Sequence, residues 1–227
     1  MTFIRLFLIS VVAVASTLAV KAQTHYKSHI SVGAHGGGAI SRMSFSPEVP
    51  QAWQPGPLVG VHVRYAEERI VGLMAELNFV NRGWKESFED NPDLKYSRTL
   101  SYITLPVMTH INFGSPRFKC FFNLGPEFAL MLSNSISSNF DYTNPGKLLP
   151  ATRRVNQMKM DIANKFDYGI TAGLGAEYYI NPRNSIFIEG RFYYGLGNIF
   201  KATKADEFSA SRTMTIAVTA GYNFRIK

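Results

Sequence analysis

Hydrophobic and polar residues alternate with a period of two along almost the whole chain beyond residue 28. This alternation is typical of β-strands with one apolar and one polar face, and the i, i+3, i+4 stripes of amphipathic helices are scarce. Most of the predicted strands have ten residues or more, whereas globular strands usually have about five or six and a tilted strand needs roughly 9–11 to cross a bilayer. The pattern predicts eight strands, over residues 28–40, 57–66, 70–82, 101–113, 117–132, 165–180, 185–197 and 212–226.

The connections between these strands alternate between short and long. Tight turns rich in turn-forming residues are expected at Ala66–Arg69, Gly114–Pro116 and Asn181–Asn184, and long polar segments at 41–56, 83–100, 133–164 and 198–211. Short turns on one rim and long loops on the other are typical of outer-membrane barrels. The sequence therefore predicts an all-β fold: an eight-stranded antiparallel up-and-down transmembrane β-barrel with short periplasmic turns and long extracellular loops.

The composition of the two strand faces indicates which one meets water. One face is apolar and often aromatic, while the other combines glycines with charged residues. A water-exposed face would avoid glycine, but the narrow interior of an eight-stranded barrel needs small residues and paired charges. We therefore expect the apolar face to contact lipid, although alternation alone leaves open a soluble barrel with that face inside. The predicted lumen network consists of Arg64, Glu76, Arg82, Glu127, Glu177, Glu189 and Arg191.

The pairing within this network depends on the register of the hairpin 165–197. A turn at 182–184 would place Glu177 opposite Glu189, which is unfavourable for two like charges. We then expect either that Arg191 bridges them or that one carboxyl is protonated. The alternative register places Glu189 opposite Gly175 and relieves the repulsion. Both registers keep the glutamates inside the barrel.

The first 22 residues differ from the rest. Arg5 precedes an apolar run from Leu6 to Val20, followed by small or tolerated residues before Gln23. This arrangement predicts a secretory signal peptide over 1–22, cleaved before Gln23, with the barrel domain over 23–227. The apolar run is shorter than the roughly 20 residues of a spanning helix.

Composition excludes several other classes of protein. Of the 227 residues 18% are charged, against about 25% in ordinary soluble domains. Cys120 is the only cysteine, so the chain has no disulfide framework. The formal net charge of +8 comes from scattered residues and suits anionic lipid headgroups better than nucleic acid, which we do not expect as a partner.

Candidate chemistry is sparse. Four histidines fall on the lumen parity without a carboxylate or cysteine spacing that would complete a metal site, so we predict no metal, no cofactor and no catalytic residue. A hydrolase-like set drawn from serine, histidine and Glu76 is conceivable, because some eight-stranded barrels modify lipids, but nothing in the spacing selects it. The histidines are His29, His35, His62 and His110, and the serines Ser28 and Ser31.

Aromatic residues near the strand ends are candidates for a belt at the membrane interfaces, where tryptophan and tyrosine are enriched. The predicted belt consists of Trp53, Tyr65, Trp84, Tyr194, Tyr222 and Phe224.

Several of the strand motifs, in this order and spacing, resemble the PorT family of outer-membrane β-barrel proteins. They are Asn81-Arg82-Gly83-Trp84, Tyr102-Ile103-Thr104-Leu105-Pro106-Val107, the glycine-rich run 166–175, the segment 194–199 and the closing Tyr222-Asn223-Phe224. The resemblance covers nearly the whole mature chain and implies an eight-stranded barrel in the outer membrane of a Gram-negative bacterium. One departure is that the chain ends Phe224-Arg225-Ile226-Lys227, without a terminal aromatic residue.

The sequence thus favours a non-enzymatic integral outer-membrane protein whose lumen is plugged by side chains. Such a protein would act through its loops or its periplasmic rim, and the loop 133–164 is the best candidate for contact with secretion-system or other envelope proteins. The founding member of the PorT family is needed for type IX protein secretion, so a role in that system is the first alternative. A lipid-modifying barrel enzyme is the second.

Overall fold

The computed structural model describes residues 28–66, 70–88, 91–150, 153–201 and 208–226. The predicted signal peptide over 1–22 lies outside these residues. No helix within the described part of the chain is both long and apolar enough to cross a membrane.

Eight long antiparallel strands make up the fold, and this confirms the predicted fold class. A two-residue strand, β2 (Gln51–Ala52), pairs with the end of one of them. Two short helical turns, η1 (Gly146–Leu148) and α2 (Asn156–Lys159), lie in the segment between the fifth and sixth long strands. The long strands are β1 (His29–Ser46), β3 (Gln54–Ala66), β4 (Val71–Glu86), β5 (Tyr96–Gly114), β6 (Phe118–Ser138), β7 (Phe166–Tyr179), β8 (Asn184–Gly195) and β9 (Ala210–Arg225).

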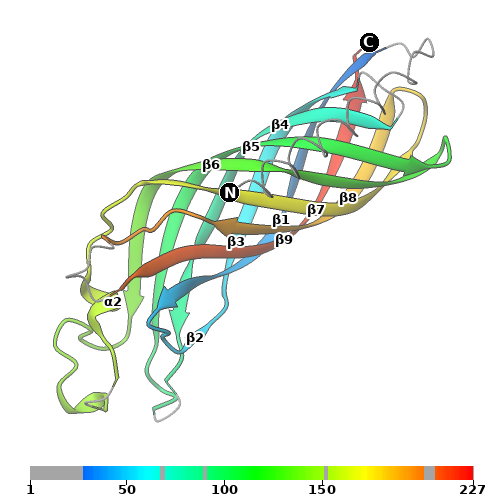
Figure 1. Ribbon diagram of the computed structural model, residues 1–227. Coiled ribbons are helices and arrows are strands. Elements are labelled where there is room, and N and C mark those ends of the chain that lie inside the picture. The colour runs from blue at the N-terminus through cyan, green and yellow to red at the C-terminus, as the bar shows by residue number, and fades with distance from the viewer. Residues whose placement is uncertain (1–27, 67–69, 89–90, 151–152, 202–207, 227) are drawn as a thin grey trace, which may run out of the picture.

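Each long strand pairs with two neighbours, so the sheet closes on itself. Pairing follows the chain order from β3 through β9, and β1 joins both β3 and β9. Because closure leaves no free edge among these strands, the backbone hydrogen bonds are satisfied within the sheet, as a bilayer requires. Figure 1 shows the resulting tilted barrel.

The two ends of the barrel differ in the length of their connections. Short turns and the C-terminal end of β9 lie at one end, at the upper right of Figure 1, and the longer segments with α2 lie at the other. Several strands continue beyond their predicted limits at the long-loop end: β1 reaches Ser46, β4 reaches Glu86 and β6 reaches Ser138. The barrel wall therefore extends past the predicted membrane-crossing strands toward the external side.

Gly83 lets β4 and β5 continue pairing in this extension. Its φ of +148° is unfavourable for other residues, and a Cβ atom built there would lie 1.9 Å from the carbonyl oxygen of Arg98. The amide of Gly83 donates a hydrogen bond to Ser41 Oγ on β1 at 2.9 Å. A glycine at this position therefore brings β1, β4 and β5 together across the external half of the lumen.

The outward face of the barrel is apolar in its middle section. Val61 on β3, Leu174 on β7 and Ile188 on β8 expose 55%, 62% and 55% of their surface. Such exposure of large aliphatic side chains over many strands is not typical of a soluble protein, in which large apolar patches are covered. The inward face carries the buried charged and polar residues.

Candidate functional site: the filled lumen

The periplasmic half of the lumen contains a network of buried charges. Arg64 on β3 reaches across to Glu177 on β7 through two parallel hydrogen bonds, Nη1 to Oε2 and Nη2 to Oε1, each 2.9 Å long. Glu177 also accepts hydrogen bonds from Ser185 Oγ at 2.5 Å and from Asn223 Nδ2 at 2.8 Å. A bidentate pair with further donors satisfies the oxygens of a buried carboxylate.

Arg191 on β8 joins two other glutamates. Its Nη1 and Nη2 atoms lie 2.5 and 2.7 Å from the Glu76 carboxylate oxygens, and Nη2 is 2.6 Å from Glu189 Oε2. Asn78 Nδ2 donates to Glu76 at 2.8 Å, and Asn123 Nδ2 donates to Glu189 at the same distance. Arg191 is therefore the central cation of this part of the network.

The expected bridge from Arg191 to Glu177 does not form, and the register explains why. The structure pairs Glu189 with Gly175 and Glu177 with Phe187, which is the alternative register that relieves the repulsion. The turn comprises 181–183, closed by a hydrogen bond from the Ile180 amide to the Asn184 carbonyl at 2.9 Å. Glu177 is consequently nearer the periplasmic end, where it pairs with Arg64.

A further ion pair lies closer to the external side. Arg82 on β4 contacts Glu127 on β6, and its guanidinium lies 4.0 Å from the centre of the Tyr193 ring. Tyr193 donates a hydrogen bond to Asp167 Oδ2 at 3.0 Å. Asp167 was missing from the predicted network, although its odd position matches those of Gly169 and Gly173 on the inward face of β7.

The histidines are part of the same polar packing. The Nδ1 atoms of His35 and His62 lie 3.2 Å apart, and His35 Nε2 lies 3.8 Å from Glu76 Oε2. His62 contacts Asn223, and His110 Nδ1 lies 2.8 Å from Asn123 Oδ1. Among the described residues, no group of three or more histidine, cysteine, aspartate or glutamate side chains could hold a metal ion.

The residues of the conceivable hydrolase set differ in their burial and in their partners. Ser28 is exposed at the start of the described chain, whereas Ser31 and His29 are buried on β1. Glu76 is held by Arg191 and Asn78.

The external half of the lumen contains a large apolar cluster beside buried polar groups such as Glu86 and Arg98, so the expectation that the whole lumen is polar is corrected there. Trp84 is fully buried at its centre, with the Phe45 ring 5.4 Å away edge-on and the Phe200 ring 6.2 Å away. Phe208 packs on both phenylalanines. The cluster also takes in Leu100 and Tyr102 of β5, Met131 of β6, Leu149 and Met158 of the segment that follows β6, and Ile199.

The aromatic belt prediction is wrong for Trp84. Residue 84 continues the even, inward-facing parity of Glu76 and Arg82 on β4, and so its side chain enters the lumen. The structure places Tyr65, Tyr222 and Phe224 partly exposed at the strand ends of the periplasmic side, and Trp53 and Tyr194 on the external side. The guanidinium of Arg42 lies 5.2 Å from the centre of the Trp53 ring.

Polar contacts fix the segment after β6 to the barrel wall. The Tyr96 hydroxyl donates to the Met158 carbonyl at 2.9 Å, and Arg98 Nη1 donates to the Met160 carbonyl at 2.7 Å. On the adjacent strand β4, Glu86 Oε2 lies 3.0 Å from Arg153 Nη2. We call the described residues of 139–165 and 196–201 the external cap.

The sequence over residues 21–201 matches the family model described as "Outer membrane protein beta-barrel domain". The chain belongs to this family. The sequence matches none of the curated proteins with which it was compared. As an outer membrane β-barrel protein, it lies in the outer membrane with its apolar face against lipid.

Solved outer-membrane proteins have a similar shape at low sequence identity. The outer membrane protein OprG from Pseudomonas aeruginosa is 11% identical with a TM-score of 0.48, over 88% of this chain and 97% of that one. Neisserial surface protein A is 13% identical with a TM-score of 0.46, over 88% and 99%. Outer membrane protein W of E. coli is 16% identical with a TM-score of 0.45, over 88% and 100%.

Proposed function

We propose that this outer membrane protein is a non-conducting, non-enzymatic barrel whose external cap binds another envelope protein. The observation that carries the proposal is the filling of the lumen at two levels. Ion pairs between Arg64, Arg191 and three glutamates cross the periplasmic half, and the cluster around Trp84 fills the external half. Eight strands leave an interior that side chains can fill, so a solute path is disfavoured.

The cap supports a binding role because it is held in place yet offers polar side chains to the outside. On α2, the buried residues Gln157 and Met158 are flanked by exposed Asn156 and Lys159. Tyr96 and Arg98 hold its backbone through the hydrogen bonds to Met158 and Met160. A fixed loop surface loses less conformational entropy on binding than a flexible one.

The cap role can be tested by site-specific crosslinking in cells. A photo-reactive amino acid in place of exposed Lys159 should give one defined adduct, and adding Arg154→Glu at a nearby exposed position of the cap should weaken or abolish it. The matched control carries the same photo-reactive group at exposed Asn181, on the periplasmic turn, and should not give that adduct. Identical adducts at both positions, or none at Lys159, would contradict a partner at the cap.

A role in type IX protein secretion is the second candidate, favoured by the motifs that resemble the PorT family. The test is a mass-spectrometric comparison of the proteins in the culture medium of wild-type and gene-deleted cells. Loss of a class of secreted proteins, restored by complementation, would support this role. An unchanged medium would exclude it and leave the cap proposal to its own test.

A further inference from the structure

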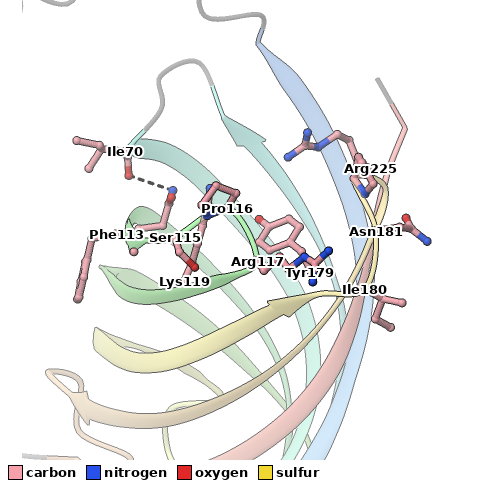
Figure 2. Close-up of a pocket in the computed structure, with 13 residues that line it drawn as sticks. Ile70, Phe113, Ser115, Pro116, Arg117, Lys119, Tyr179, Ile180, Asn181 and Arg225 are labelled. Carbon is pink, nitrogen blue, oxygen red and sulfur yellow. Dashed lines mark hydrogen bonds between the residues drawn. The ribbon is translucent and has the colours of Figure 1, made fainter.

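The periplasmic end of the barrel opens into a cavity of about 950 Å³, in contrast to the filled lumen above it. The turns 112–117 and 179–182, together with Lys119 and Arg225, line this cavity, which we call the periplasmic mouth. In Figure 2 the Tyr179 ring and the Arg225 guanidinium face the opening, whereas Ile70, Phe113 and Ile180 point away from it. The mouth therefore presents cationic and aromatic side chains to its opening, while apolar residues form its outer edge.

The charge of the mouth is one-sided. Among the described residues, Arg117, Lys119 and Arg225 line it and no aspartate or glutamate does. Within the described residues, neither Arg117 nor Arg225 forms an ion pair, and the buried Nε of Arg225 has no hydrogen-bond partner. Arg64, deeper in the lumen, is by contrast neutralised by Glu177.

The cations converge on one region of the barrel interior. Lys119 at the start of β6 and Arg225 at the end of β9 both line the mouth. The Lys119 ammonium lies 5.4 Å from the centre of the Tyr179 ring, and the amide of Arg225 donates to the Arg183 carbonyl at 2.8 Å. Strands far apart in the sequence therefore contribute cations to the same recess.

The chemistry of the mouth defines the ligand that it would bind. A guanidinium presents a planar fork of donors that matches a carboxylate, and such charge-assisted hydrogen bonds are stronger than neutral ones. The cavity is in the size range of ligand pockets, about 300–1,000 Å³, and it is formed by the turns at the end of the barrel axis. It faces the periplasm, which favours a soluble chain over a lipid headgroup.

We propose that the periplasmic mouth binds an acidic peptide segment of a periplasmic protein, with carboxylates paired to Arg117 and Arg225. This inference goes beyond the proposed function, because it concerns the opposite end of the barrel from the external cap. It gives the protein a contact on the periplasmic side of the outer membrane that does not depend on whether the cap has a partner.

The test measures binding of a fluorescein-labelled hexaglutamate peptide to the full protein in phosphatidylcholine nanodiscs by fluorescence anisotropy. The double variant Arg117→Gln/Arg225→Gln should bind about tenfold more weakly or worse, since a hydrogen bond to a charged group contributes about 1.5–3 kcal/mol. The matched control Lys95→Gln/Lys165→Gln removes the same charge from exposed external positions and should bind as the wild type does. Hexaglutamine should not bind.

Other outcomes would overturn the proposal. Equal affinity of the double variant and the wild type would place the peptide elsewhere. No binding to the wild type would mean that the mouth does not take a polyanionic chain. Loss of peptide binding when phosphatidylglycerol is added to the nanodiscs would assign the mouth to a lipid headgroup. If the double variant does not fold, Arg117→Gln alone, on an exposed turn, makes the same comparison.

Discussion

Replacing Arg191 with methionine tests the lumen network at its central cation. The Arg191 guanidinium contacts Glu76 at 2.5 and 2.7 Å and Glu189 at 2.6 Å, and all three side chains are buried. Methionine has a similar length but no charge, so the change leaves two carboxylates without their cation. Because an uncompensated buried charge costs about 3–5 kcal/mol, we expect Arg191→Met to lower the free energy of unfolding by about that amount.

The assay is equilibrium unfolding by urea from lipid vesicles, followed by tryptophan fluorescence. The matched control is Arg183→Met, the same substitution at an exposed turn residue, whose effect should stay within about 0.5 kcal/mol. Adding Glu76→Gln and Glu189→Gln to Arg191→Met should recover much of the loss, because the stranded charges are then gone. Equal stability of Arg191→Met and Arg183→Met, or no recovery in the triple variant, would refute the pairing.

Two further predictions concern the apolar cluster and the space inside the barrel. Trp84→Ala should lower the free energy of unfolding by about 3–5 kcal/mol, as for other buried aromatic residues, whereas Trp53→Ala should change it by less than about 1 kcal/mol. In the variant Trp53→Phe, Trp84 is the remaining tryptophan, and its fluorescence should resist quenching by acrylamide. Gly173→Ala should destabilise the barrel by about 1–3 kcal/mol, because its Cβ would lie 2.0 Å from Glu189 Oε1. The control is Gly190→Ala, whose Cβ would meet only the Leu174 carbonyl oxygen, at 4.0 Å. Equal losses of unfolding free energy in the two variants, measured by urea unfolding, would contradict the prediction.

The alternation of residue types was sufficient to predict the barrel and the direction of its faces. Glycines next to charges, such as Gly175 beside Glu177, occur where the lumen is narrow, and this combination indicates an inward face. The periodicity of two is a local property of the backbone, so it can be read without knowing which strands pair. It does not specify partners across the lumen, because these depend on the register and tilt of every strand.

Two incorrect predictions, the belt position of Trp84 and the partner of Glu177, both concern contacts between segments that are far apart in the sequence. Trp84 was assigned to the belt from its position near a strand end, although its parity matched that of Arg82. Its burial depends on Phe200 and Phe208, which come from a distant connection that no local pattern places inside the barrel. The partner of Glu177 depended on a turn shift of one residue, since Asn181 rather than Pro182 begins the turn.

The central claim, a lumen closed at two levels, is tested most directly by ion conductance. The purified protein, inserted into a planar lipid bilayer in molar salt, should give no conductance steps above the bare membrane, because the Arg191 network and the Trp84 cluster together block the axis. Arg191→Met/Glu76→Gln/Glu189→Gln should remain closed as well, since the apolar cluster is untouched. Stable, reproducible open-channel steps from the wild-type barrel would contradict the account.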